Sequence, residues 1–334
     1  GGTASLLLAD QTTEINVIPN ALPPEKALTF SAPQLPALVR PGDTVSFKCR
    51  AKNISGYPVS LAPKLYLDGV EVKEMSKVKL DAGESVIIVD TLYPPKIGGL
   101  HLLALHNGPT RRIKVYTKPE ETLVLHYTFN DVQGKVVPDH SGCGNDGEVI
   151  GTLQFQPGVQ GSGFKAQTGN VQVPNSESLE IAEETLTMLC WYKPADEDGK
   201  ASLVTKGGHN MMKFNGKWQL QLAIGGWGVG QCHFNVPYDP VTKGPQWQNK
   251  WSHFAGTRSN DTLHIYYNGS HVSQLAVKGT IGHTDFPWCI GTNSEIPIGR
   301  TPDGIIDEVM IFADALNREQ IDSIYQKVRS RLMQ

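Results

Sequence analysis

The sequence predicts an all-β protein made of two β-sandwich modules, with one helix at its C-terminal end. Glycine and proline are abundant, at 34 and 22 of 334 residues, which favours a chain with many turns. Apolar and polar residues alternate at period two in many segments, as half-buried strands require. Clear helical spacing comes only at the end. There Ile321, Ile324, Tyr325 and Val328 follow Asn317, which is a predicted N-cap.

Composition excludes several classes of function. An apolar fraction of 39% and a charged fraction of 19% suit a soluble globular chain, and no apolar run approaches the roughly 18 residues of a membrane span. Residues 1–118 carry 14 Lys and Arg against 10 Asp and Glu, and residues 119–334 carry 16 against 23, so nucleic acid is not an expected partner. The chain starts at Gly1 without a signal peptide. We interpret it as a mature form or a fragment of a larger multidomain protein.

Three regions follow one another along the chain. Residues 1–27 read as an N-terminal extension or linker. Residues 28–118 contain a strand of period two at 45–51, a hairpin turning at Asp68-Gly69, and strands at 85–92, 99–107 and 111–117. About seven short strands in about 90 residues predict an immunoglobulin-like sandwich, interpreted as a spacer domain. A polar hinge at 118–121 marks the expected start of the second domain, 119–334.

The second domain opens with a strand and an unusual loop. Apolar Leu123, Leu125, Tyr127 and Phe129 alternate with more polar neighbours, and the strand then ends. The loop that follows is rich in oxygen-bearing side chains and glycine; they are Asn130, Asp131, Asp139, Ser141, Asn145 and Asp146. Such a loop either hydrogen-bonds to its own backbone or surrounds a hard cation.

This opening resembles that of a laminin-G-like, concanavalin-type jelly-roll module. The shared features are a strand ending in Phe-Asn-Asp and the run Asp-x-Ser-Gly-x-Gly-Asn-Asp-Gly from Asp139. Segments 173–179, 186–194, 251–257, 263–269 and 304–316 match in the same order, so the resemblance spans roughly 121–322. It implies a carbohydrate- or protein-binding fold, usually without catalysis.

The resemblance also implies one structural calcium ion. It would lie where the first strand and its loop meet the closing Ile-Asp-Glu-Val strand. Asp139, Asn145 and Asp307 are the expected side-chain ligands, followed by Asn130 or Asp131, with loop carbonyls completing the shell. Zinc is disfavoured because no His or Cys is needed. In the alternative, Asp139 and Asn145 only cap turns and Asp307 pairs with a Lys or Arg.

No catalytic constellation is recognisable. Glycosidases need two carboxylates about 5–10 Å apart, and the Glu-x-Asp-x-x-Glu run of related jelly-roll glycosidases is absent. Asp307 and Glu308 are adjacent, so on a strand they point to opposite faces. Gly-x-Ser-x-Gly and His-Glu-x-x-His motifs are also missing. We therefore expect a protein that is not an enzyme.

A sugar site needs exposed aromatic rings beside polar groups. Trp227, in a glycine-rich loop, and Trp247 are the candidate platforms, with His209, Asn210 and Tyr238 as polar partners and Gln221 and Asn235 as further ones. Rim packing is the alternative role for both tryptophans, whereas Trp191, Trp251 and Trp288 lie in apolar runs typical of a core. Of the five cysteines, only Cys232 and Cys289 are considered for a disulfide.

Together these features favour a non-catalytic carbohydrate-binding fragment of a larger extracellular or cell-surface protein, attached to a polysaccharide-processing enzyme. Its partner would be a poly- or oligosaccharide. The alternative is an adhesion or structural module that binds a protein surface and has no affinity for sugar.

Overall fold

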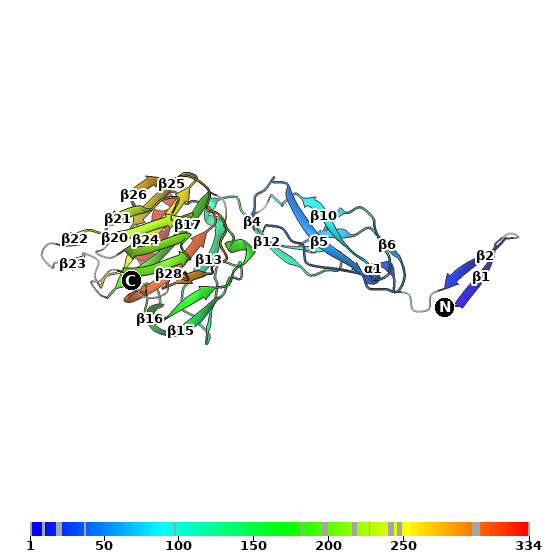
Figure 1. Ribbon diagram of the computed structural model, residues 1–334, viewed down its shortest axis with the longest axis horizontal. Helices are drawn as coiled ribbons and strands as arrows, with labels where there is room; N and C mark the ends of the chain where they lie inside the picture. Colours follow the sequence, from blue (N-terminus) through cyan, green and yellow to red (C-terminus); the bar gives the residue numbers. More distant parts are fainter. Residues whose placement is uncertain are drawn as a thin grey trace. The chain divides into compact units, whose positions relative to one another are not determined.

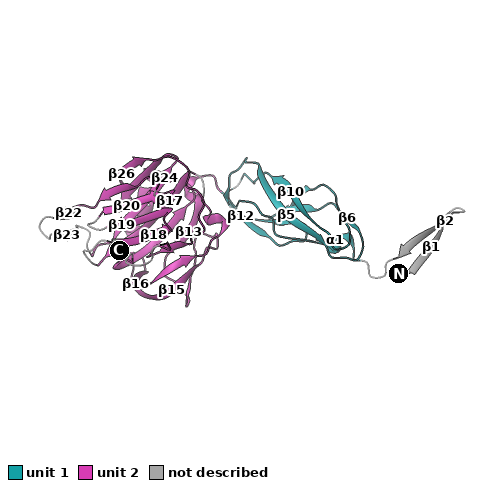
Figure 2. Cartoon of the chain, in the orientation of Figure 1, with its two compact units in different colours: residues 1–115 teal, residues 116–334 magenta. Residues whose placement is uncertain are grey.

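The computed structural model divides the chain into two compact units, Gly1–Val115 and Tyr116–Gln334 (Figure 2). It describes residues 22–36, 38–96, 98–181, 184–195, 200–215, 219–226, 228–239, 244–245, 249–295 and 301–332, and the backbone of 2–8 and 11–17. The division falls just before the hinge expected at 118–121. None of the described helices is long and apolar enough to cross a membrane.

Unit 1 is a β-sandwich. One sheet has the strand order β10 (Ser85–Leu92), β5 (Val45–Asn53), β3 (Leu28–Phe30), and the other has the order β4 (Leu38–Val39), β12 (Arg111–Val115), β11 (Gly99–Leu105), β7 (Lys64–Leu67), β8 (Val70–Glu74). Two small pairs and a short helix accompany them: β1 (Gly2–Leu8) with β2 (Gln11–Val17), β6 (Val59–Leu61) with β9 (Val78–Leu80), and α1 (Pro24–Ala27). Two layers of this order, antiparallel except for the parallel pair of β4 and β12, are the arrangement expected of an immunoglobulin-like domain.

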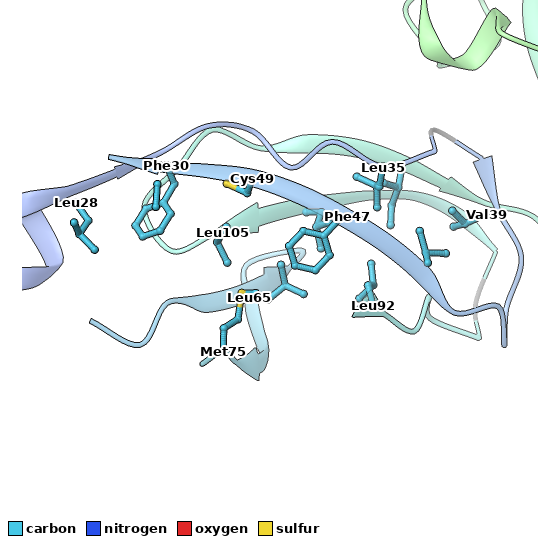
Figure 3. Packing of buried hydrophobic residues seen from close by; sticks show 14 of the residues in the cluster. Leu28, Phe30, Leu35, Val39, Phe47, Cys49, Leu65, Met75, Leu92 and Leu105 are labelled. Carbon is cyan, nitrogen blue, oxygen red and sulfur yellow. The ribbon is translucent and has the colours of Figure 1, made fainter. Parts of the chain in front are cut away.

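Alternation along the strands builds the core of unit 1. Successive side chains point to opposite faces of a strand, and all nine residues of β5 alternate between buried and exposed. Phe47 of β5 meets Leu65 and Leu105 from the facing sheet in one buried cluster (Figure 3). The predicted hairpin is also present, because Asp68 and Gly69 both have positive φ, at 51° and 79°, as a two-residue hairpin turn requires.

Unit 2 is a large curved sheet folded into two layers (Figure 1). Its strands follow the order β21 (Cys232–Asn235), β20 (Gln219–Ile224), β19 (Asn210–Asn215), β18 (Lys200–Lys206), β27 (Trp288–Ile290), β16 (Ser162–Val173), β28 (Gly304–Phe312), β17 (Thr185–Pro194), β24 (Ser252–Ser259), β25 (Thr262–Tyr267), β26 (Ser270–Ala276). Strand β16 joins the layers, since Phe164 pairs with Ile306 of β28 and Val171 pairs with Ile290 of β27. Strands β21 and β26, at the two ends of the path, also contact each other.

The remaining elements of unit 2 attach to this sheet or lie in its loops. They are η1 (Pro119–Thr122), β13 (Leu123–Tyr127), β14 (Val136–Val137), β15 (Gly147–Pro157), η2 (Glu177–Leu179), β22 (Tyr238–Asp239), β23 (Gly244–Pro245) and α2 (Arg318–Leu332). β13 pairs with β28, and β15 pairs with both β14 and β16. The opening stretch therefore belongs to the same sheet as the closing strand.

Helix α2 begins and packs as the sequence predicts. Asn317 Oδ1 accepts a hydrogen bond from Gln320 N at 3.0 Å, and Gln320 Oε1 accepts one from Asn317 N at 2.8 Å, which is a capping box. Leu316 and Ile321 are buried in one cluster. Tyr325 stacks on Trp191 of β17 with ring centroids 5.5 Å apart. The predicted all-β fold with a C-terminal helix is confirmed.

The disulfide considered between Cys232 and Cys289 is not formed. Both thiols are free and buried, and Cys232 Sγ lies 3.3 Å from Ser273 Oγ. Trp191 and Trp288 are buried in the core as expected, at 2% and 0% exposure.

Candidate functional site

The four predicted metal ligands lie in two separate groups, and Asp139 belongs to the first. Its Oδ1 accepts hydrogen bonds from the backbone nitrogens of His126 and Ser141, both at 2.9 Å. Its Oδ2 accepts from Ser141 Oγ at 2.7 Å and from Asn145 N at 2.9 Å. The Asp139 carboxylate thus holds the loop after β13 in place, as the turn-capping alternative describes.

Asn145 is also bound within this loop. Its Nδ2 donates to Val124 O at 2.7 Å and to Ser178 Oγ at 2.8 Å. Its Oδ1 accepts from Ser176 Oγ at 2.6 Å, and its backbone carbonyl accepts from the Tyr127 hydroxyl at 2.6 Å. Asn145 is 4% exposed. These bonds stabilise the start of the sheet.

The second group, Asn130 and Asp307, meets the loop between β15 and β16. Asn130 Oδ1 accepts a hydrogen bond from Ser162 N at 2.7 Å, and Asp307 Oδ2 accepts one from Gln160 N at 3.1 Å. The loop approaches both side chains closely. A Cβ on Gly161 would lie 2.1 Å from Asn130 Oδ1, and a Cβ on Gly158 would lie 2.4 Å from Asp307 Oδ2. Side chains larger than glycine therefore do not fit at these two positions.

Unusual backbone conformations flank this second group. Phe129, directly before Asn130, has φ of 54°, and Glu308, directly after Asp307, has φ of 48°. Non-glycine residues rarely adopt this left-handed region, and such outliers cluster at functional sites. At Glu308 the pairing of β28 with β17 also shifts register. The carboxylates of Asp307 and Glu308 are both buried, but their partners differ. Asp307 accepts a hydrogen bond from Gln160 N, whereas Glu308 Oε2 lies 2.9 Å from His126 Nε2.

The electrostatics of Asp307 suit a nearby cation. Burial raises the pKa of Asp307 to about 8, opposed by hydrogen bonds from the loop backbone and assisted by the charge of Glu308. No Lys or Arg among the described residues forms an ion pair with Asp307. An ionised carboxylate buried without a partner is costly.

The donor set decides which cation fits. The described residues contain no group of three His, Cys, Asp or Glu side chains arranged to hold a metal. A cation at Asn130 and Asp307 would therefore also need backbone carbonyls, such as those of 158–161. Oxygen donors of this mixed kind suit calcium.

The predicted ligand-binding residues fall mostly in loops. Trp227 and Trp247 lie outside the described residues, and for Tyr238 only the backbone is described, paired with Pro245. The carbonyl of His209 accepts hydrogen bonds from Gly225 N at 2.9 Å and Gly226 N at 2.7 Å.

Asn210 is 2% exposed, and its Oδ1 accepts a hydrogen bond from Gly225 N at 3.1 Å. His209 and Asn210 therefore hold the turn that immediately precedes Trp227.

A polar face on β18–β21 contains Gln221, one of the predicted polar partners, together with residues that sequence reasoning missed. Register places Lys213 opposite Ser202 and Gln221, and Gln221 opposite His233. Cross-strand partners share a face, so these four residues lie together, opposite the core-facing row of Met212, Phe214 and Leu222. We call Ser202, Lys213, Gln221 and His233 the polar face. Period-two alternation hints at Lys213 and Gln221 in the sequence, but their juxtaposition depends on tertiary register.

Part of the polar face is buried and incompletely hydrogen-bonded. Ser202, Lys213 and Gln221 are 0%, 2% and 2% exposed. Gln221 Nε2 donates to Gln231 Oε1, but Ser202 Oγ and Gln221 Oε1 have no hydrogen-bond partner. Buried polar atoms in folded proteins are nearly always paired. Ser202 Oγ and Gln221 Oε1, on either side of Lys213, therefore keep hydrogen-bonding capacity that the described residues do not use.

Loop 291–295 borders this face. Asn293 Nδ2 donates to Gly207 O at 3.2 Å and lies 3.5 Å from Met211 Sδ, and Met211 is on the same side of β19 as Lys213. Thr205 Oγ1 donates to Thr292 O at 2.7 Å. The loop is thus anchored at one end of the polar face.

This architecture, a curved two-layer sheet whose first and last strands pair, defines a concanavalin-type jelly-roll module. Residues 165–322 match the family model described as the Concanavalin A-like lectin/glucanases superfamily. The resemblance noted in the sequence is thus confirmed for residues 165–322. No curated protein matches the chain.

Solved structures of similar architecture include domain 4 of AbnA, a GH43 extracellular arabinanase from Geobacillus stearothermophilus, in complex with arabinotriose. The identity is 18% and the TM-score 0.47, over 61% of this chain and 98% of that one. The binding domain of botulinum neurotoxin serotype C1 has 19% identity and a TM-score of 0.47, and the match covers 63% of this chain and 53% of that one. The botulinum neurotoxin DC binding domain in complex with rat synaptotagmin II has 16% identity and a TM-score of 0.47, and the match covers 63% of this chain and 52% of that one. This chain spans about half the length of the neurotoxin domains.

Proposed function

We propose that unit 2 is a non-catalytic carbohydrate-binding module whose glycan contacts the polar face of β18–β21. The observation that carries the proposal is the pair of unpaired buried oxygens, Ser202 Oγ and Gln221 Oε1, beside Lys213. They lie on the opposite side of the sheet from Met212, Phe214 and Leu222. The match of residues 165–322 to a lectin and glucanase superfamily supports the proposal.

The chemistry of this face matches that of a sugar. Each sugar hydroxyl both donates and accepts hydrogen bonds. Ser202 offers a hydroxyl, Gln221 an amide oxygen, and Lys213 an ammonium donor. A few polar groups placed in this way orient a ligand, while most of the contact area comes from apolar and aromatic neighbours. We assign the stacking role to Trp227 and Trp247. Trp227 follows the turn that His209 and Asn210 hold, and Tyr238 remains a proposed polar partner.

The same face argues against hydrolysis. Glycoside hydrolysis uses two carboxyl groups on either side of the scissile bond. The polar face, as defined by its four described residues, contains no carboxylate. Asp307 and Glu308 are on β28 and are bound to the 158–162 loop and to His126. Binding without catalysis is therefore the function that this face supports.

We also propose one structural calcium ion between Asn130, Asp307 and the carbonyls of 158–161. Bound there, calcium would neutralise the buried Asp307 carboxylate and fix the strand ends on which the module depends. Asp139 and Asn145 would act indirectly, by shaping the loop after β13.

In its cellular setting we propose an extracellular or cell-surface protein, with unit 1 as a spacer and a polysaccharide-processing enzyme as the larger assembly. The rival proposal is an adhesion module that binds a protein through unit 2 and has no affinity for sugar. The two differ in one measurable property, the affinity of unit 2 for glycans.

A glycan array screened with the full chain in calcium tests the proposal, followed by calorimetry on any glycan that binds. Ser202→Ala and Gln221→Ala should each weaken binding about tenfold, because each removes one buried polar contact. Gln274→Ala, at an exposed position of β26, is the matched control and should bind as the parent does. Absence of any bound glycan, or equal affinity of all variants, would contradict the proposal.

A further inference from the structure

Exposed apolar side chains are concentrated on unit 1. Of sixteen large hydrophobic residues exposed among the described residues, ten lie between Leu22 and Leu102. Single exposed apolar residues are ordinary, but grouped ones mark interaction surfaces. Strand β10 carries one such group, with Ile87 51% and Val89 59% exposed.

Strand β10 has an open edge. It pairs with β5 on one side, and no described strand pairs with its other side (Figure 1). Its eight residues, Ser-Val-Ile-Ile-Val-Asp-Thr-Leu, contain no Pro, Gly or Lys. Natural edge strands are usually protected by such residues, by bulges or by a covering segment. One such protection is present at the end of the strand, where Asp90 lies on the core-facing side and Lys73 of β8 pairs with it and donates to Thr91 O at 3.4 Å. Among the described residues the stretch 85–89 has none of these protections.

A row of positive charge runs beside this edge. Lys48, Arg50 and Lys52 are exposed on β5, and their partners across the ladder on β10 are Val89, Ile87 and Ser85. On β3 the neighbour of Lys52 is Thr29. None of the three basic residues forms an ion pair with a described carboxylate.

Two other strand lysines of unit 1 form ion pairs. Lys64 Nζ lies 2.8 Å from Glu71, and Lys73 Nζ lies 2.7 Å from Asp90. On β5, by contrast, three unpaired basic residues stand in one row. Like charges at neighbouring same-face positions repel, so an anionic partner would stabilise this arrangement.

We propose that the open edge of β10, with Ile87, Val89 and the basic row of β5, binds an extended segment of another protein that carries acidic side chains. The segment adds to the sheet as a further strand. Unit 1 is then a second binding module rather than only a spacer.

The geometry of strand addition matches the open edge, the exposed apolar side chains and the basic row. An added strand would lie about 4.8 Å from β10, and its side chains would alternate between the two faces. On the outer face, the aliphatic parts of the glutamate side chains would pack on Ile87 and Val89. Their carboxylates would contact the basic row of β5, whose long side chains reach over β10. On the inner face, apolar residues would lie beside Ile88, which is half-buried at the margin of the core.

A protein segment fits better than an acidic polysaccharide. The edge offers backbone N–H and C=O groups at peptide spacing, which a second peptide strand satisfies. Ile87 and Val89 are aliphatic and give no aromatic ring for a sugar to stack on.

Fluorescence anisotropy of labelled peptides with the full chain tests the proposal. The probe alternates Glu and Val over eight residues, the length of β10. It should bind, and the Lys48→Glu, Arg50→Glu, Lys52→Glu variant should bind it at least roughly tenfold more weakly. Ile87→Thr with Val89→Thr, which keeps strand propensity, should also weaken it. Lys26→Glu, Lys77→Glu, Lys79→Glu, at exposed positions elsewhere on unit 1, is the charge-matched control and should bind normally.

A peptide N-methylated along its length separates strand addition from charge attraction, because it keeps the carboxylates and loses the backbone donors. It should not bind. Equal binding of the methylated peptide would overturn the proposal, as would displacement of both peptides by polygalacturonate. Absence of peptide binding, with or without self-association of the chain, would also overturn it. Glycan affinity of unit 2 is measured in parallel and is expected to be unchanged in every unit 1 variant.

Discussion

The backbone nitrogen of Gln160 donates a hydrogen bond to the buried carboxylate of Asp307 at 3.1 Å. The side chain of the same Gln160 accepts one from Arg331 of helix α2 at 2.8 Å. One loop residue thus joins the closing strand to the C-terminal helix. The charge of Asp307, and any cation bound to it, should therefore affect the stability of this whole side of unit 2.

Calcium should raise the melting temperature of the chain, and Asp307→Asn should abolish the response. At calcium 100-fold above its dissociation constant, linkage predicts about 2.7 kcal/mol of stabilisation. The asparagine variant removes the buried charge and so should melt no lower than the parent in EDTA. Calorimetry in EDTA and then in excess calcium is the measurement. An unchanged midpoint in parent protein, shown to be metal-free by elemental analysis, would rule the ion out.

Asp139→Ala should destabilise unit 2 by about 2–4 kcal/mol while leaving the calcium response intact. The carboxylate accepts four hydrogen bonds, one from His126 of β13 and three within the loop that follows, and hydrogen bonds to a charged group contribute about 1.5–3 kcal/mol each before the loop relaxes. Denaturant unfolding with and without calcium measures both effects. Loss of the calcium response in this variant would instead make Asp139 a direct ligand.

Acid should weaken the fold through His253. Complete burial lowers the pKa of His253 from 6.5 to about 3, and both of its ring nitrogens lack partners. The unfolded chain takes up this proton below pH 6.5 and the folded chain does not, so stability falls as pH drops from 6.5 toward 3. The slope from this group approaches about 1.4 kcal/mol per pH unit.

His253→Phe supplies the matched comparison for that pH dependence. Phenylalanine keeps an aromatic ring against Trp191 and Tyr325 but does not titrate. Urea unfolding of both proteins from pH 7 to pH 4 should give a shallower slope for the variant. Parallel slopes would mean that other groups set the acid sensitivity.

Trp227→Ala or Trp247→Ala should lower the affinity for any glycan found. Loss of one stacking ring commonly costs about 1–3 kcal/mol at a binding site. Calorimetry with the identified glycan measures it, and Trp251→Phe, at a residue packed beside Trp191, controls for general effects of losing an indole. Parent-like affinity in both alanine variants would place the site elsewhere.

Features set by local pattern could be predicted from the sequence. The alternation of β5, the Asp68-Gly69 turn and the Asn317–Gln320 capping box all depend on residues close together in the chain. The candidate ion site could be predicted only in part. Asp139 and Asn130 are close in sequence and both offer side-chain oxygen, but only tertiary packing brings Asn130 to the 158–162 loop beside Asp307.

Gln221 could be predicted as a polar partner, but the polar face as a whole could not, for a different physical reason. Ser202, Lys213 and Gln221 meet because three strands align in one register, and a shift of one residue would turn each side chain to the other face. Residue type alone does not fix that register. The unpaired state of Ser202 Oγ and Gln221 Oε1 follows from packing as well.

The pairing of β13 with β28 has a mechanical consequence. The two strands run antiparallel, and Leu123, where the chain enters the sheet, lies opposite Phe312, where it leaves. Tension applied between these two points pulls across the ladder, so its hydrogen bonds open one after another, like a zipper. Strands loaded along their length would instead have to break many bonds at once. Under stretching, this pair should therefore be the first part of the sheet to yield.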